Sequence, residues 1–240
     1  MRIRVIVPII VDIFDEEVKK EFGSHSSSEV EEIEVVHLDK GTASIESEFD
    51  EALAAPDILN KVIEAEKKGF DGVIIDCFGD PAVKAAREVV DIPVVGAAEP
   101  SMLLACSLGQ RFSVVTVLEN VIPMIENIAK VLGVYEKLAS VRSVNIPVLE
   151  LHDKDTLKNA LFEEMLKAIK EDKAHVLILG CTGMMGVADD LHEMLAKEGY
   201  DVPVIDPAAA SIRFLEVLIG LGLKQSRLTY MKPPEKERKL

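Results

Sequence analysis

Two stretches of this chain, residues 66–109 and 170–222, repeat one order of segments. Each copy runs from a charged segment into a short aliphatic run, then to a cysteine, a glycine turn, an amphipathic segment, a proline-led strand and an aliphatic helix. Short aliphatic runs that end in small-residue turns are typical of buried parallel strands. The repeat therefore predicts an α/β protein of two similar lobes, each a parallel sheet flanked by helices, related by a pseudo-twofold axis with a cleft between them.

Hydrophobic periodicity locates the individual elements. Strands are expected at residues 3–10, 33–37, 72–76, 93–96, 112–117, 139–145, 175–179 and 203–206. Helices are expected at residues 50–69, 81–90, 98–108, 121–133, 155–172, 186–198 and 208–222, with an acidic helix directly after the first strand. The Ser-rich and then acidic segment 23–34 is expected to be a solvated loop. We assign residues 1–97 and 208–240 to one lobe and residues 98–207 to the other.

Length and charge exclude several classes of function. A chain of 240 residues with 48% hydrophobic content can fill a core, and its formal net charge of −15 argues against nucleic acid or an anionic membrane as partner. No apolar stretch approaches the roughly 20 residues that span a bilayer. The amino-terminal segment lacks a cleavage site and is interpreted as the first strand, so we expect a cytoplasmic protein. A small-molecule substrate remains compatible with this composition, because a local set of backbone N–H groups can bind it.

Cys77 and Cys181 occupy equivalent places in the two repeats, each after a strand and before a glycine turn. Ligands of open α/β sheets bind at the carboxyl ends of the strands, so the two thiols are expected to face one cleft. Asp80 and Pro81 predict a helix start just after Cys77, and a helix amino terminus would lower the pKa of a nearby thiol. A thiolate on one side of a carbon and a thiol on the other form the acid/base pair that a racemase needs.

A lone cysteine at a strand end is more often inert core than functional. Two cysteines in equivalent repeat positions favour function. Cys106 lies in an aliphatic segment without a glycine turn, and we expect it to be core packing.

These residues lie within segments that resemble the aspartate/glutamate racemase superfamily, and within it the hydantoin and allantoin racemase branch. The resemblance covers most of the chain. It rests on five segments: GTASIESEFDEALAAP at 41–56, IIDCFGDPAVKAAREVVDIPVVGAAEPSMLLA at 74–105, RFSVVTV at 111–117, LILGCTGMM at 177–185 and VPVIDPAAA at 202–210.

The resemblance implies a two-lobed α/β fold, no metal, no cofactor and a homo-oligomer, with Cys77 and Cys181 as the acid/base pair. The chain departs from the branch at one motif. The branch has Asn-Pro-Asn after the first strand, whereas this chain has Val7-Pro8-Ile9, which retains Pro8 and lacks both amide side chains.

Seven other residues are candidates for substrate binding. Amino-acid racemases of the superfamily place Asn-Thr after the first cysteine, whereas this chain has Phe78-Gly79, which favours a neutral ring amide. Thr182, beside the second cysteine, offers a hydroxyl donor and leaves an aspartate or glutamate racemase as an alternative. The full set of candidates is Pro8, Ser44, Phe78, Gly79, Thr116, Thr182 and Gly183. Thr116 has a structural interpretation as well, as the end of a strand. Ser44 and Glu46 belong to a loop that could close over the cleft, and Glu46 has the alternative role of starting the helix that ends at Gly69.

Other chemistry finds less support. His152, His175 and His192 are scattered, and no cluster has metal-ligand spacing. The glycines do not form a dinucleotide or phosphate fingerprint. The leading interpretation is a cofactor-independent racemase of 5-substituted hydantoins or a related cyclic ureide. The alternatives are an amino-acid racemase, a maleate-type isomerase and a two-lobed ligand-binding protein without catalysis.

Overall fold

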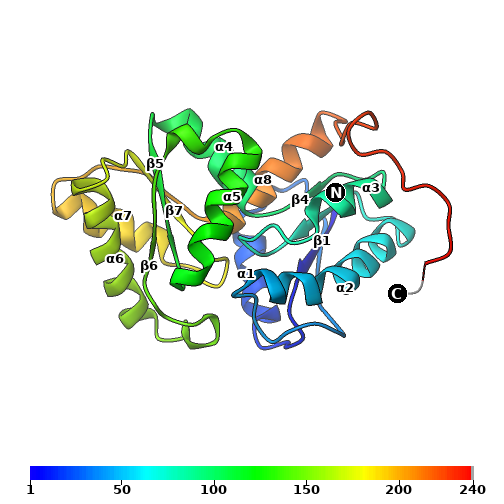
Figure 1. Cartoon of the computed structure of the whole chain (residues 1–240), viewed down its shortest axis with the longest axis horizontal. Coiled ribbons are helices and arrows are strands. Elements are labelled where there is room, and N and C mark those ends of the chain that lie inside the picture. Colours follow the sequence, from blue (N-terminus) through cyan, green and yellow to red (C-terminus); the bar gives the residue numbers. More distant parts are fainter. Residues whose placement is uncertain (239–240) are drawn as a thin grey trace.

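The computed structural model describes residues 1–238 and contains two separate parallel sheets of four strands each (Figure 1). The strands of the first sheet are β1 (Arg2–Val7), β2 (Glu32–His37), β3 (Gly72–Ile75) and β4 (Val94–Val95). The strands of the second sheet are β5 (Phe112–Thr116), β6 (Leu138–Ser143), β7 (Val176–Leu179) and β8 (Val204–Ile205). The strand orders, β2-β1-β3-β4 and β6-β5-β7-β8, are the same, which confirms the predicted two-lobed α/β architecture.

Helices cover both sheets, as parallel strands require. The α-helices are α1 (Asp15–His25), α2 (Glu48–Lys67), α3 (Val83–Val89), α4 (Ala98–Leu108), α5 (Ile122–Leu132), α6 (Lys154–Lys170), α7 (Ala188–Lys197) and α8 (Pro207–Gly220). Three short 3-10 helices are η1 (Glu119–Val121), η2 (Tyr135–Lys137) and η3 (Val148–Glu150).

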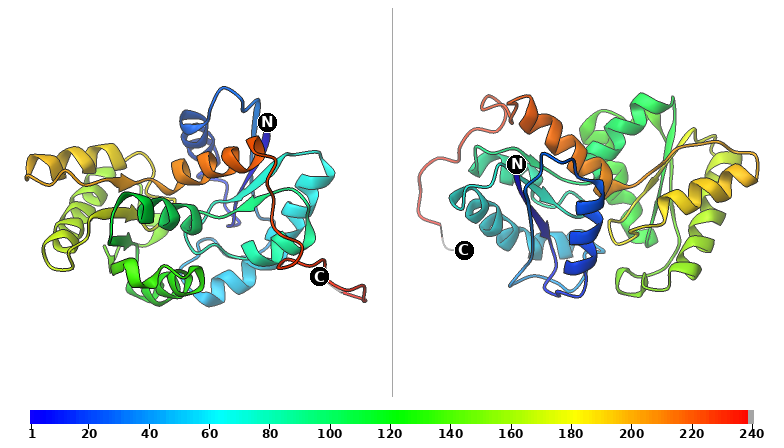
Figure 2. Two further views of the ribbon diagram at one scale, coloured as in Figure 1. Left: turned by 90° about the horizontal axis from the view of Figure 1, so that it is seen from above. Right: turned by 180° about the vertical axis from the view of Figure 1, so that it is seen from behind.

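The chain passes between the lobes twice, after β4 through α4 and after β8 through α8 (Figures 1 and 2). The buried face of α4 packs on the core of the second sheet through Met102 and Ala105, and that of α8 packs on the first sheet through Ile212 and Leu215. The two helices also contact each other. Each crossing thus ends in a helix anchored in the lobe that it enters.

The lobes exchange side chains next to the cysteines. Phe78, which follows Cys77 of the first lobe, is buried against the core of the second lobe. Met185, which follows Cys181 in the second lobe, is buried against the core of the first. The two sheets are therefore held together at the end where the cysteine turns lie.

Several predicted boundaries are shifted, and local contacts or backbone conformation account for three of the shifts. The first strand ends at Val7 rather than at residue 10, because Pro8 has no N–H for the ladder and the N–H of Ile9 turns back to the Val7 carbonyl. Helix α1 extends into the expected loop, to His25, where the hydroxyls of Ser24 and Ser26 donate to carbonyls three residues earlier. Helix α3 begins at Val83 rather than at residue 81.

Asp80 was expected to cap the helix that follows it, and this expectation was wrong. Asp80 and Ala82 have φ of +49° and +58°, which delays that helix. The Asp80 carboxylate instead accepts hydrogen bonds from the backbone N–H groups at the start of α4, at Ala97 (2.7 Å), Ala98 (2.8 Å) and Glu99 (2.9 Å). Asp80 therefore fixes the first crossing between the lobes.

Replacing Asp80 with Ala leaves three N–H groups at the start of α4 without their acceptor. We expect Asp80→Ala to lower the free energy of unfolding by about 2 kcal/mol, measured by urea denaturation. The matched control is Asp155→Ala at an exposed carboxylate in the first turn of α6, expected to change it by less than about 0.5 kcal/mol. Equal stability of the two variants would contradict the assigned role.

Candidate active site

The two cysteines lie at the carboxyl edges of the two sheets, at matching positions. Strand β3 ends at Ile75, two residues before Cys77, and strand β7 ends at Leu179, two residues before Cys181. Both cysteines are half-buried, and both line one cavity between the lobes. The fold therefore brings the two sequence-predicted thiols to one cleft.

Each sulfur accepts a hydrogen bond from the backbone two residues further on. The Gly183 N–H donates to Sγ of Cys181 at 3.4 Å, and the Gly79 N–H bonds the sulfur of Cys77. A Cβ at position 79 would lie 2.1 Å from Oε1 of Glu51, and one at position 183 would lie 3.0 Å from Cδ1 of Leu151. A larger residue at either position would therefore require one of these side chains to move, and each turn directs an N–H group at its sulfur.

The expected lowering of the thiol pKa values was wrong. Burial raises the pKa of Cys77 well above its usual value, opposed by the Gly79 N–H and reinforced by the charges of Glu51, Cys181 and Asp76. Burial also raises the pKa of Cys181, to about 12. Because helix α3 starts six residues after Cys77, its amino terminus does not lie at the sulfur. The sequence pattern placed that helix too early.

The cavity wall is mostly apolar. Its apolar side chains are Val7, Pro8, Ile9, Phe14, Val18, Ile45, Phe78, Val117, Val121, Met124, Val148 and Met185. Within residues 1–238, its ionisable members are the two cysteines, Glu51 and Asp76, and no Lys, Arg or His lines it. Lys154, whose Nζ donates to the Met185 carbonyl, lowers the pKa of Cys181 from outside the wall.

Glu51 and Asp76 are site residues that sequence reasoning missed. Burial raises the pKa of each carboxyl to about 7, with added repulsion from Glu48 and Asp80 at Glu51. Oε1 of Glu51 and Oδ1 of Asp76 are buried and have no hydrogen-bond partner within the described chain. The position of Asp76, between a buried strand and the cysteine, was a usable signal, whereas Glu51 reaches the cleft from helix α2 and left no local trace in the sequence.

Five of the seven predicted binding residues line the cavity with the cysteines: Pro8, Phe78, Gly79, Thr182 and Gly183. The hydroxyl of Thr182 donates to the backbone carbonyl of Asp76 at 3.2 Å, so it bridges the two lobes.

The structure does not place Thr116 or Ser44 in the cavity wall formed by residues 1–238. Thr116 is fully buried, and its hydroxyl donates to the Gly180 carbonyl at 3.0 Å. Ser44 donates to the carboxylate of Glu46 at 3.0 Å. Both hydroxyls are therefore hydrogen-bonded within the protein rather than exposed in the cavity wall.

The loop before α2 links the lobes beside the cleft. Oε1 of Glu46 accepts a hydrogen bond from the Val148 N–H at 2.7 Å, and the Asn120 side chain donates to the Glu46 carbonyl. Glu46 does not cap α2, because Ser47 does so by accepting from the Asp50 N–H. Ile45 of this loop lines the cavity.

Cys106 and His192 lie outside the cavity wall. Cys106 is half-buried against the core of the second lobe, as expected for packing. His192 is partly exposed and contacts the Val202 carbonyl through Nδ1 at 2.9 Å.

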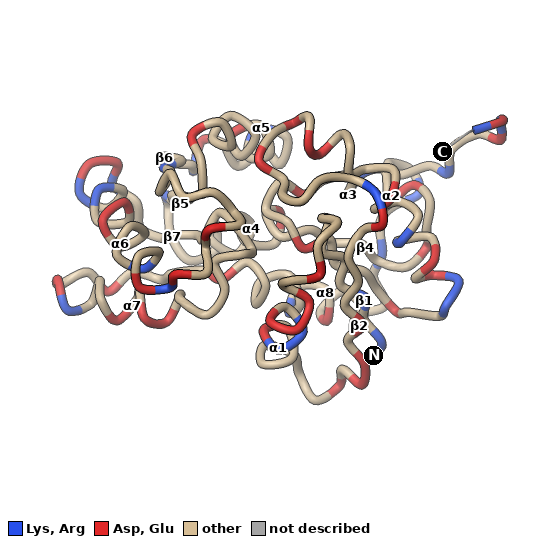
Figure 3. The backbone as a smooth tube through the Cα atoms, turned by 90° about the horizontal axis from the view of Figure 1, so that it is seen from below, with Lys and Arg blue, Asp and Glu red and all other residues tan. Residues whose placement is uncertain are grey.

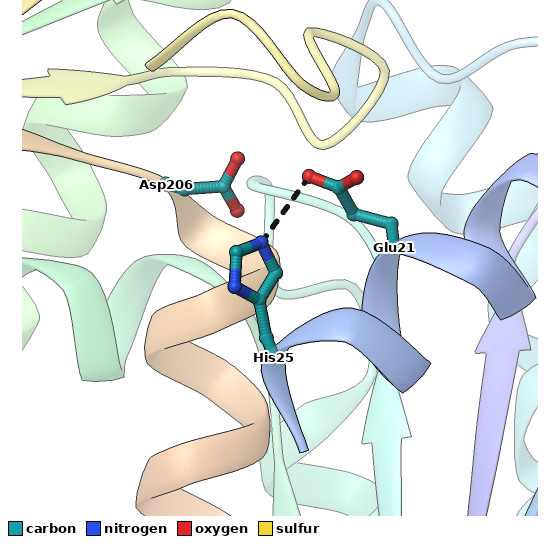
Figure 4. A group of neighbouring side chains, drawn as sticks. All are labelled: Glu21, His25 and Asp206. Atoms are coloured by element: carbon teal, nitrogen blue, oxygen red, sulfur yellow. Dashed lines mark ion pairs between the residues drawn. The ribbon is translucent and has the colours of Figure 1, made fainter. Parts of the chain in front are cut away.

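The fold gathers one group of potential metal ligands that sequence spacing did not reveal (Figure 4). Glu21 and His25 lie one turn apart on α1, and Asp206 precedes α8, with ligand atoms within 4.8 Å of one another. Glu21 accepts from the Gly186 N–H, and Asp206 caps α8 by accepting from the N–H groups of Ala208 and Ala209. The hydrogen bond between Glu21 and Gly186 therefore joins the two lobes.

Two further observations concern the distribution of charged residues and the hydrophobicity of the helices. Figure 3 shows Lys and Arg interspersed with Asp and Glu along the elements rather than gathered on one of them. In the part of the chain that the structure describes, no helix is both long and apolar enough to cross a bilayer.

Known proteins resemble this chain in both sequence and fold. The family model of Asp/Glu/hydantoin racemases matches residues 13–215. The hydantoin racemase of Pseudomonas sp. (strain NS671) is 38% identical over 238 residues, which cover 99% of this chain and 93% of that protein. The allantoin racemase of Klebsiella pneumoniae superposes with a TM-score of 0.91 at 34% identity, covering 98% of this chain and 95% of that one.

A second allantoin racemase structure, from Pseudomonas fluorescens, has a TM-score of 0.92 at 32% identity and covers 99% of both chains. The two-lobed fold and the family match together define a racemase. This chain belongs to the Asp/Glu/hydantoin racemase family.

The raised thiol pKa values predict slow alkylation of the unliganded protein. At pH 7, Cys77 and Cys181 are thiols rather than thiolates, so iodoacetamide should modify them more slowly than it modifies the same cysteines in the unfolded chain. Their rates should rise about tenfold per pH unit through pH 9, read by mass spectrometry of the two peptides. A rate that is high and constant from pH 6 upward would contradict the raised pKa values.

Proposed function

We propose that this protein is a cofactor-independent racemase of 5-substituted hydantoins or a related cyclic ureide, with Cys77 and Cys181 as the two bases. The observation that carries the proposal is the position of the two thiols, which reach one cavity from equivalent turns of opposite lobes. Two bases from opposite sides are what inversion at a carbon requires, because one removes the proton and the other returns it. The hydantoin and allantoin racemases among the relatives support the substrate class.

The proposed reaction depends on the acidity of the C5–H bond of the hydantoin ring. The C5–H of a hydantoin lies between a carbonyl and an amide nitrogen, so its removal leaves an enolate with charge on the carbonyl oxygen. Donors fixed in an apolar cavity stabilise such charge more than water does. The N–H groups of Gly79 and Gly183, which bond the sulfurs, are the donors of the two cysteine turns, whereas the Thr182 hydroxyl is already bonded to the Asp76 carbonyl. Phe78 and Pro8 supply apolar surface against the ring or its substituent.

The wall composition supports a neutral substrate over a free amino acid. An α-carboxylate would enter a cavity with two carboxyls and, within residues 1–238, no cationic side chain in its wall. Burying an unpaired charge there is costly. Structures of a glutamate racemase and a maleate isomerase share the fold at 17% and 15% identity. An amino-acid racemase and a maleate-type isomerase are therefore the activities to test against, together with a binding protein without catalysis.

We further propose a homo-oligomer in the cytoplasm. Leu103, Leu104 and Leu108 of α4 and Val217 of α8 are each between 39% and 56% exposed along one groove, which supports an apolar contact with another copy. All three cysteines are free thiols, in keeping with a reducing compartment.

Replacing either Cys77 or Cys181 with Ala should lower racemisation at least about 100-fold, because one face loses its base. Each variant should still exchange the substrate C–H with deuterated solvent, from one enantiomer only and the opposite one in the two variants, read by NMR. Cys106→Ala is the matched control and should racemise normally. Full racemisation by either single variant would reject the two-base assignment.

A substrate panel separates the candidate activities. We expect loss of optical rotation with a chiral 5-substituted hydantoin or allantoin, and none with L-aspartate or L-glutamate, because the cavity offers no cation to their carboxylates. Maleate should give no fumarate. Turnover of the free amino acids alone would replace the proposed substrate class, and binding without turnover of any panel member would favour the binding protein.

A further inference from the structure

The two cysteine turns are equivalent in backbone but differ in one side chain that matters for charge. The residue before Cys181 is Gly180, and the residue before Cys77 is Asp76. A Cβ at position 180 would lie 2.7 Å from Cγ1 of Val114 and 2.9 Å from Cβ of Thr116, so the second turn has no room for a side chain. The first turn therefore contributes a carboxyl that its counterpart excludes.

This carboxyl is buried and unsatisfied at the cavity wall. Asp76 is 5% exposed and lines the cavity, and its Oδ1 has no hydrogen-bond partner among residues 1–238. Its backbone is fixed on both sides, since its N–H donates to the Ile6 carbonyl at 2.8 Å and its carbonyl accepts from Thr182. A buried polar atom without a partner is destabilising, and a bound ligand group can supply the missing hydrogen bond.

The surroundings leave about half of this carboxyl protonated at pH 7 and most of it protonated at lower pH. Burial raises its pKa to about 7, and the charges of Asp206 and Glu21 reinforce the shift while the Thr182 hydroxyl opposes it. The other ionisable groups at the same cavity are Glu51 from α2 and the two thiols, and none of these is a cation. His25, which pairs with Glu21 at 3.5 Å, is the cation-forming group of the neighbouring cluster (Figure 4).

We propose that neutral Asp76 donates its O–H to the substrate carbonyl next to the reacting carbon, and to the enolate oxygen that forms there. This inference rests on the proposed function and adds a catalytic residue to it.

The step balances without another reactant. The thiolate of one cysteine takes the C5 proton, so a C–H bond breaks and an S–H bond forms, and the electron pair moves into the ring and onto the carbonyl oxygen. Asp76 keeps its proton in a hydrogen bond to that oxygen. The opposite thiol then protonates C5 from the other face, and its sulfur becomes the thiolate.

The pH dependence of kcat/KM carries the first part of the test. Thiolate increases with pH, whereas neutral Asp76 decreases as pH rises through its pKa of about 7. The two trends cancel above that pH, so kcat/KM of the native protein should rise up to about pH 7 and then level off. In Asp76→Asn, whose amide donates at every pH, kcat/KM should continue to rise above pH 7.

Two substitutions at the same position separate the possible roles. Asp76→Asn should keep kcat/KM at pH 7 within about tenfold of the native value, whereas Asp76→Ala should lose about 100-fold, mainly in kcat, as expected for one missing donor to an oxyanion. Equal large losses in both variants would overturn the proposal in favour of a carboxylate that accepts the thiol proton. Equal small effects, with the plateau retained in both, would also overturn it by leaving a structural role.

Two further variants test the assignment of the plateau. Glu51→Gln removes the other carboxyl with a pKa of about 7, and the plateau should persist in it. Loss of the plateau in Glu51→Gln with retention in Asp76→Asn would overturn the proposal. Asp57→Asn is the matched control at a buried carboxyl outside the cavity, where Oδ2 accepts from the Asp39 N–H.

A readout without turnover distinguishes this failure from failure of the proposed function. The Asp76 charge raises the pKa of both Cys77 and Cys181. Thiolate absorbance should therefore develop at lower pH in Asp76→Asn than in the native protein, and an unchanged titration would count against the placement of Asp76 beside the sulfurs. Hydantoin racemisation that needs both cysteines but not Asp76 would reject only this inference, whereas racemisation without the cysteines would reject the proposed function.

Discussion

The hydrogen bond from Thr182 to the Asp76 carbonyl joins the two turns on which the cleft depends. Parallel strands deliver their following residues at one edge of a sheet, so a single sheet could present both cysteines only side by side. Two sheets that meet at these edges bring one cysteine to the shared cavity from each lobe. The exchange of Phe78 and Met185 between the two cores holds that arrangement with apolar contacts on either side of the bond.

The apolar cleft disfavours the charged forms of its acidic groups, because it offers them few hydrogen-bond or charge partners. Burial raises the pKa values of the two thiols and of Glu51 and Asp76, so at pH 7 the thiols are uncharged and about half of each carboxyl is protonated. Such a site resists charged ligands, and the N–H groups of Gly79 and Gly183 become effective where charge develops during reaction. The same low polarity that makes the thiols weak acids disfavours a carboxylate ligand, in keeping with the neutral substrate that we propose.

The repeat in the sequence was sufficient to predict the architecture and the two cysteines, because strand periodicity and turn glycines are local properties. The repeat could not predict contacts between segments that are distant along the chain. Asp80 looked like the cap of the adjacent helix, yet left-handed backbone at Asp80 and Ala82 directs its carboxylate to α4. Glu51 is twenty-six residues before Cys77 along the chain, and only the packing of α2 brings it to the cavity. The thiol pKa values were misjudged for the same reason, since burial is a property of the folded chain.

The two walls of the cleft are unequal, with Asp76 and Phe78 beside one sulfur and Gly180 and Thr182 beside the other. Mirror-image substrates therefore meet different environments, although their free energies in solution are the same. Thermodynamics then requires equal kcat/KM in the two directions, while kcat and KM are each free to differ between the enantiomers. A protein built from two copies of one unit can in this way hold one hand of its substrate more tightly without shifting the final one-to-one mixture.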